Sequence, residues 1–62
     1  MKDFEITKTL KNGLKIELYM NLYGQYVVTV FTSDYKALES KRTTDYFNAL
    51  HKMTILENKY SK

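Results

Sequence analysis

Apolar and polar residues alternate along two stretches near the beginning of the chain, residues 4–10 and 14–20. This alternation predicts two β-strands, each with one side facing a core. The apolar positions of these strands are Phe4, Ile6, Leu10, Leu14, Ile16, Leu18 and Met20. We therefore expect the two stretches to pair as neighbours in one sheet, with these side chains on a shared face.

The loop of residues 11–13, with the sequence KNG, decides how these two strands pair. A two-residue turn would place Leu10 opposite Lys15 and mix the two faces. A three-residue loop with Gly13 in the left-handed conformation places Leu10 opposite Leu14, which keeps the apolar side chains together. The remaining pairs in this register are Ile6 with Leu18 and Phe4 with Met20. The three-residue loop is therefore the interpretation that we prefer.

Residues 26–31, with the sequence YVVTVF, predict a third strand that is apolar on both of its faces. The connection before it, residues 21–25, includes Gly24, which adopts the left-handed conformation easily. If Met20 pairs with Tyr26, the core face continues across the third strand. A tighter two-residue turn that ends at Gly24 reverses the faces of this strand, and the sequence leaves that alternative open.

The rest of the chain changes from strand-like to helical periodicity. Ser33 and Asp34 indicate a turn, and residues 35–42 then predict a weaker fourth strand, although this stretch also suits a helix. Thr44 and Asp45 predict the start of a helix, because a hydroxyl caps free N–H groups and a carboxylate is favoured at this end. The side chains expected to face the sheet are Tyr46, Ala49, Leu50 and Met53, with Phe47 at the margin.

The end of this helix is less clearly marked than its start. Continued helical phase places Ile55 on the outer side and Glu57 near the middle of the inner side. Either the helix ends near Thr54 or Ile55 contacts a partner, and we prefer the first. The chain is expected to be a single α+β domain, residues 1–62. It consists of an antiparallel three- to four-stranded meander sheet followed by one C-terminal helix packed on one face.

The composition narrows the classes of protein to which the chain can belong. A chain of 62 residues forms one small domain, which buries only about 60% of the surface of its unfolded form. It has no cysteine and a single histidine, His51, which excludes disulfides and argues against a zinc site. No apolar stretch is long enough to span a bilayer or to form a secretion signal. We expect a cytosolic protein that uses no cofactor, metal or small-molecule substrate.

Groups suited to catalysis are scarce. A nucleophile needs a base within hydrogen-bond distance, and His51 lies on the flank of the predicted helix away from the core. The carboxylates are scattered along the chain, and Glu5 and Glu17 meet only diagonally on the sheet. The sequence contains no phosphate-binding loop, dinucleotide fingerprint or metal-binding spacing. The chain is therefore not expected to be an enzyme.

The second face of the predicted sheet carries the most informative residues. It combines aromatic and β-branched side chains with Thr, Glu and Lys, as interaction surfaces do. Tyr19 is expected opposite Val27, and Lys15 opposite Phe31. The predicted interface residues are Tyr19, Tyr23, Val27, Phe31, Tyr35 and Ile55. Two alternatives remain: residues 55–60 fold back over this face, or the two faces are exchanged.

Single-stranded nucleic acid is an alternative ligand for the same face, because such sites combine aromatic rings with cations. The residues for this alternative are Lys8, Lys15, Tyr19 and Phe31. A further row of lysines, which is predicted along the outer side of the helix, consists of Lys41, Lys52 and Lys59. Glu5 and Glu17 lie among the aromatic residues of the sheet, where they repel phosphates. The net charge of +3 permits contact with acidic partners but does not require nucleic acid.

The predicted order of elements resembles that of a known family. A meander of four strands followed by a helix is similar to the single-strand-binding transcriptional coactivator fold, in which paired subunits bind nucleic acid. That similarity concerns architecture and transfers no residues. The short chain is rich in Lys, Tyr, Asn and Thr and has the order hairpin, strand and then TTDYFNALHKM. In these features it also resembles small accessory proteins of phages and mobile elements in AT-rich bacteria. This second resemblance implies an anti-defence type of inhibitor, which acts by occupying a surface of a host enzyme or complex.

The sequence therefore favours a non-enzymatic interaction protein that binds another macromolecule and forms a homodimer. Its most specific form is a phage-type inhibitor of a bacterial defence or nucleic-acid-processing protein complex. The alternative is a single-stranded nucleic-acid-binding protein that uses the outer face of the sheet. The identity of the target is not encoded in any motif of the sequence.

Overall fold

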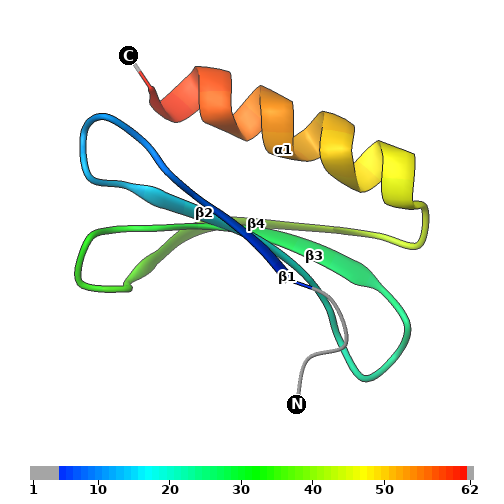
Figure 1. The fold of residues 1–62 in the computed structure, drawn as a ribbon. Helices are drawn as coiled ribbons and strands as arrows, with labels where there is room; N and C mark the ends of the chain where they lie inside the picture. The colour runs from blue at the N-terminus through cyan, green and yellow to red at the C-terminus, as the bar shows by residue number, and fades with distance from the viewer. Residues whose placement is uncertain (1–4, 62) are drawn as a thin grey trace.

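The computed structural model describes residues 5–61, which form one four-stranded antiparallel sheet and one helix (Figure 1). In chain order, the elements are β1 (Glu5–Thr9), β2 (Lys15–Met20), β3 (Tyr26–Phe31), β4 (Ala37–Thr43) and α1 (Tyr46–Tyr60). The strands lie side by side in that same order. The α+β meander with a C-terminal helix is thus confirmed, and residues 37–43 form a strand rather than a helix.

The strand register agrees with the expectation from the loops. Ile6 pairs with Leu18, and Met20 pairs with Tyr26, so the tighter turn at Gly24 is excluded. The expected pairs on the other face are also present, namely Tyr19 with Val27 and Lys15 with Phe31. The expected pairing of Phe4 lies outside the described residues.

All three hairpin turns share one backbone hydrogen-bond pattern. The N–H of the first residue donates to the carbonyl four residues later, and the N–H of the fourth residue donates back to the first carbonyl. The turns are residues 10–14, 21–25 and 32–36. The fourth residue has a left-handed backbone in each turn: Gly13 (φ 89°), Gly24 (φ 76°) and Tyr35 (φ 65°). A tyrosine therefore occupies the position that is glycine in the first two turns.

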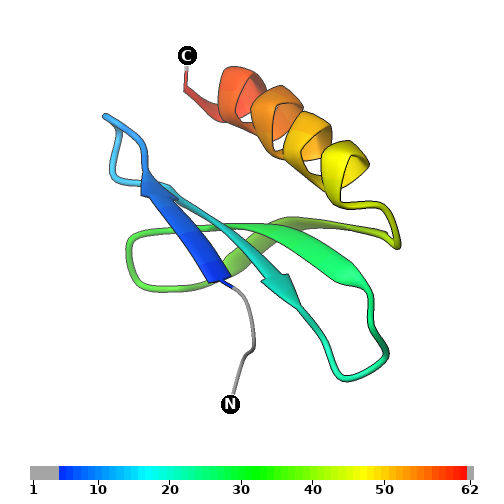
Figure 2. The same ribbon diagram turned by 45° about the vertical axis from the view of Figure 1, so that its right-hand side comes forward.

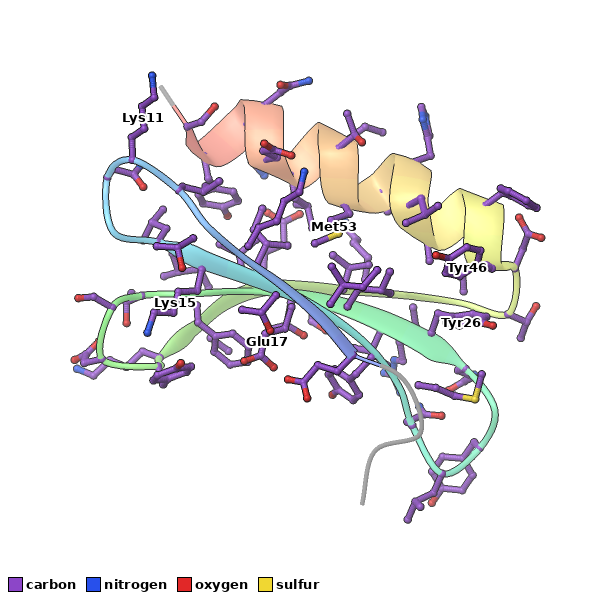
Figure 3. All side chains as sticks on the ribbon, viewed as in Figure 1. Lys11, Lys15, Glu17, Tyr26, Tyr46 and Met53 are labelled. Carbon is purple, nitrogen blue, oxygen red and sulfur yellow. The ribbon has the colours of Figure 1, made fainter. Side chains whose placement is uncertain are left out.

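The hydrophobic core lies between α1 and one face of the sheet, which we call the inner face. The fully buried side chains of this face are Ile16, Leu18, Val28 and Val30, and those of α1 that pack on them are Ala49, Met53 and Leu56. Figure 3 shows Met53 pointing from the helix towards the sheet, with Tyr46 and Tyr26 together near the start of the helix. Their ring centroids are 5.5 Å apart.

The helix begins and ends differently from the expectation. Asp45 is the N-cap, and its carboxylate accepts a hydrogen bond from the N–H of Asn48 at 2.8 Å, so the cap is not the hydroxyl of Thr44. The expected end near Thr54 is wrong, because α1 continues to Tyr60. Leu56 is buried and Tyr60 packs against the core, and both follow Met53 at the spacing of one helix face.

The other face of the sheet, which we call the outer face, has no helix or strand packed on it within residues 5–61 (Figure 2). The alternative that residues 55–60 fold back over this face is therefore wrong, since they belong to α1 on the inner face. This outer face is the part of the fold that positions the candidate site.

Candidate interaction surface

The outer face is arranged in three rows that run across the strands. The middle row is polar and consists of Thr7, Glu17, Thr29 and Ser40. The row towards the β2–β3 turn consists of Glu5, Tyr19, Val27 and Arg42. The row towards the β3–β4 turn consists of Thr9, Lys15 and Phe31. The aromatic groups of this face are thus divided by a polar row rather than gathered in one cluster.

Val27 is buried although no element covers the outer face. Only 5% of its surface is exposed, as is the case for Thr29 in the middle row. Val27 lies between Tyr19 and Arg42 in the register, and long side chains on neighbouring strands reduce the exposure of the residue between them. Thr29 is similarly enclosed, and its hydroxyl lies 3.2 Å from that of Ser40. Val27 therefore offers little surface to a partner.

The exposed aromatic group of this face is Tyr35. Its side chain is 55% exposed, and its ring centroid lies 5.8 Å from that of Phe31 with a tilt of 55°. The Nζ of Lys15 lies 4.2 Å from the centre of the Tyr35 ring and donates a hydrogen bond to its hydroxyl at 3.1 Å. Figure 3 shows Lys15 on the side of the sheet away from α1, beside the β3–β4 turn. Lys15, Phe31 and Tyr35 form one cluster, which we call the Tyr35 cluster.

The turn that carries Tyr35 is held by the side chain of Thr32. The Thr32 hydroxyl accepts a hydrogen bond from the N–H of Lys36 at 3.0 Å and donates one to the carboxylate of Asp34. These hydrogen bonds add to the two backbone hydrogen bonds of the turn. Together they fix the direction in which the side chain of Tyr35 projects from the turn. The cluster is therefore positioned by three connected elements: β2, β3 and the turn that follows β3.

Three of the predicted interface residues lie away from this cluster. Tyr19 is half-buried in the row at the opposite end of the outer face. Tyr23 is 87% exposed, but it belongs to the β2–β3 turn at the other end of β3. Ile55 is exposed on the outer side of α1, in the other layer of the molecule. With Val27, which pairs with Tyr19, four of the six predicted interface residues thus lie apart from the cluster. The other two, Phe31 and Tyr35, are brought together in it.

The outer side of α1 carries an aromatic residue that the sequence analysis placed at the margin of the core. Phe47 is 76% exposed and stands in one row with the exposed His51 and Ile55, at intervals of four residues. The helix is packed through the opposite side, so this row faces away from the sheet. The regular spacing of four residues between Phe47, His51 and Ile55 was the signal in the sequence for this exposed row.

The four residues proposed for nucleic acid do not share one surface. Lys8 lies on the inner face, and its Nζ forms an ion pair with Glu57 of α1 at 3.1 Å. Only Lys15, Tyr19 and Phe31 lie on the outer face. The exposed surface near Lys15 is therefore less basic than the sequence suggested.

The row of lysines predicted along the outer side of α1 instead faces the edge of the sheet. The Nζ of Lys59 lies 2.8 Å from Glu39 of β4, and the Nζ of Lys41 lies 3.4 Å from the same carboxylate. Tyr60 donates a further hydrogen bond to Glu39 at 2.8 Å. Hydrogen bonds from Lys59 and then from Tyr60 lower the pKa of Glu39 from 4.5 to about 2, although burial opposes this effect. The same contact raises the pKa of Lys59 and of Tyr60.

A shallow hollow lies where the end of α1 meets the β1–β2 turn. Its lining consists of Thr9, Leu10, Lys11, Glu57 and Ser61. The single carboxylate in it, Glu57, is the one paired with Lys8. Within residues 5–61, no three His, Asp or Glu side chains gather closely enough to hold a metal ion, and no helix has the length and apolar character needed to cross a membrane.

The chain was also compared with known proteins. No protein-family model matches it, and neither a curated protein nor a solved structure shows significant similarity to it. The function of the surfaces is therefore inferred from their geometry.

Proposed function

We propose that this chain is a non-catalytic binding protein, which occupies a surface of another protein with the Tyr35 cluster. The observation that carries this proposal is the left-handed backbone of Tyr35. A bulky side chain in this conformation costs roughly 1–2 kcal/mol relative to glycine. Such a cost is large for a domain of this size, whose stability is marginal. Because glycine serves the same turn position twice in this chain, the ring of Tyr35 must have a role of its own.

The properties of the cluster favour a protein as its partner. Tyrosine combines a large apolar ring with a polar hydroxyl and is enriched among the residues that dominate protein interfaces. The ring of Tyr35 is held by Phe31 and Lys15, so that little side-chain entropy is lost when it is bound. The Lys15 amine is already directed at Tyr35, and Glu17 stands beside it in the polar row. This local charge pattern suits a protein surface better than a chain of phosphates.

The most specific form of the proposal is a phage-type inhibitor of a bacterial defence or nucleic-acid-processing complex, acting in the host cytoplasm. It is supported by the length and the Lys/Tyr/Asn/Thr-rich composition of the chain, together with a rigid exposed cluster on a small domain. The burial of Val27 leaves less apolar surface on the outer face for the expected homodimer. The proposed partner is therefore a different protein rather than a second copy.

The proposal is tested by capturing proteins from a bacterial lysate on the immobilised chain, with and without nuclease treatment. We expect the captured protein to be retained after nuclease, lost with Tyr35→Gly, and retained with Phe47→Ser. The control variant Phe47→Ser removes an even more exposed aromatic ring from the opposite layer of the molecule. Capture that is unaffected by Tyr35→Gly would contradict the proposal.

A second candidate function is the binding of single-stranded nucleic acid by the same cluster. It is favoured by the two neighbouring rings of Phe31 and Tyr35 with the Lys15 amine beside them, since stacked bases are held in this way. Capture that disappears after nuclease treatment would select this function. The affinity for an oligothymidylate should then fall steeply with salt, because bound cations are released from phosphates.

A further inference from the structure

Strand β4 forms an open edge of the sheet. Within residues 5–61 it pairs with β3 alone, so the N–H and C=O groups on its other side have no strand partner. It is the longest strand, with seven residues, it contains no proline, and most of its side chains are exposed. An edge of this kind can be extended by another strand in the antiparallel or the parallel direction.

The inner side of this edge is lined by lysines. Lys41 of β4 pairs with Val28 and therefore points towards the helix side of the sheet. Lys59 of α1 reaches β4 at Glu39, so this flank of the helix faces the same edge. Lys52 lies on this flank as well, because it precedes Lys59 by two helical turns, or about 10 Å. The amines of Lys41 and Lys59 therefore flank the open edge, with Lys52 on the same side of the helix, and we call these three residues the lysine row.

Glu39 is the acidic residue of β4, and it is largely occupied by its own chain. Its carboxylate is held by Lys59, Lys41 and Tyr60. It therefore neutralises part of the lysine row but leaves the edge with an excess of positive charge. A strand added to β4 would be attracted by this charge if it carried acidic side chains on the helix side.

A second copy of the chain fits this edge poorly. A symmetric dimer in which all of β4 pairs antiparallel with its copy would be centred on Ser40. Glu39 would then lie opposite Lys41 of the copy, which is favourable. However, both helices would lie on the same face of the extended sheet, and the two lysine rows would meet across the seam. The charge on the edge therefore disfavours a second copy and favours an acidic strand.

We infer that β4 accepts an extended acidic segment of a partner protein as a fifth strand, with alternate Asp or Glu side chains facing Lys41, Lys52 and Lys59. The remaining side chains of the segment would lie on the outer side, beside Ser40 and Arg42 of β4. This inference deepens the proposed function, since it also assumes a protein partner, but it concerns a different surface from the Tyr35 cluster. Main-chain bonds supply affinity in this mode, and the alternating charges supply selectivity.

The test uses a blocked synthetic peptide with the sequence Glu-Val-Glu-Val-Glu-Val-Glu and amide chemical shifts of the labelled full-length chain. We expect the amides of β4 to shift and to exchange more slowly with solvent when the peptide is added. The double variant Lys41→Glu/Lys52→Glu should weaken binding about tenfold, as expected for two reversed surface ion pairs. The matched double variant Lys11→Glu/Lys36→Glu carries the same change in net charge away from the row, and it should change affinity less than twofold.

A second peptide, with proline in place of each valine, keeps the charge but cannot pair as a strand. We expect it to bind at least tenfold more weakly, and equal binding of the two peptides would overturn the inference. The inference also fails if the amides of β4 do not move, or if an oligothymidylate binds more tightly and depends on the same lysines.

Tyr35→Gly separates this inference from the proposed function. It should leave peptide binding unchanged within twofold, because the Tyr35 cluster lies outside the lysine row. Loss of peptide binding with intact Tyr35-dependent capture overturns only the inference about β4. Intact peptide binding to β4 without Tyr35-dependent capture leaves the β4 inference supported and overturns only the proposed role of the cluster.

Discussion

The two faces of the sheet are buried by different means. On the inner face, Leu18 and Val28 are sealed by the helix, as in most two-layer domains. On the outer face, Val27 and Thr29 reach almost the same degree of burial, although no helix or strand within residues 5–61 packs on this face. An apolar residue on the open face of a central strand therefore does not require a partner molecule. What remains exposed on this face lies at its end, around Tyr35.

The largest effect should follow from truncation on the inner face. Leu18→Ala removes a side chain that is fully buried between β2 and α1. We expect the free energy of unfolding to fall by about 2–5 kcal/mol, which approaches the whole stability of a small domain. Urea unfolding followed by circular dichroism measures this change. A loss below about 1 kcal/mol would show that the helix does not seal this face.

Truncation in the middle of the outer face should have a smaller effect. Val27→Ala deletes two methyl groups that are shielded only by neighbouring side chains, so the site can partly refill or admit water. We expect a loss of about 1–2 kcal/mol in the same urea experiment. The exposed control, Phe47→Ala, should change stability by less than about 0.5 kcal/mol. A loss for Val27→Ala as large as that for Leu18→Ala would remove the difference between the faces.

Acid should weaken the attachment of the helix to the inner face. The pKa of Glu39 is lowered from 4.5 to about 2 in the folded chain, so its contribution to stability is complete above the unfolded pKa. That contribution is lost as the pH falls from about 4.5 towards 2. Glu39→Gln should therefore be less stable than the wild type at pH 7, and the two should converge in acid.

Thermal unfolding of both chains across this pH range measures the convergence. Asn58→Ala, on an exposed position of α1, serves as the control and should keep a constant difference from the wild type. A difference between Glu39→Gln and the wild type that stays constant with pH would exclude the proposed role of the carboxylate.

The register of the first hairpin could be predicted from the sequence, whereas the end of the helix could not. The loop length and Gly13 were sufficient to pair the first two strands, because a shift by one residue would have exchanged the faces. The pairing of β2 with β3 agrees with the preferred expectation, but the sequence left a tighter turn at Gly24 open. The position of Glu57 in the inner phase of the helix suggested an early end near Thr54. The structure places this carboxylate at the margin of the core, where Lys8 neutralises it, and Leu56 continues the buried side.

The candidate site could be predicted only in part. Tyr35 was among the predicted interface residues. Its left-handed backbone was not predicted, because no glycine marks the third turn. The left-handed residues are nevertheless evenly spaced, at Gly13, Gly24 and Tyr35, and this repeat was the signal in the sequence. The burial of Val27 could not be predicted, because apolar patterning does not describe how far neighbouring side chains cover a residue.

The central claim is that the ring of Tyr35 serves binding, although glycine at this position would make the folded chain more stable. The free energy of unfolding of Tyr35→Gly, measured beside the complementary variant Gly24→Ala, tests it most directly. We expect Tyr35→Gly to be more stable than the wild type by about 0.5–1 kcal/mol, since relief of the backbone exceeds the loss of the ring contacts. Gly24→Ala, whose added Cβ meets no neighbour, should be less stable by about 1 kcal/mol. A Tyr35→Gly chain that is less stable than the wild type would contradict the claim, because the ring would then serve the fold itself.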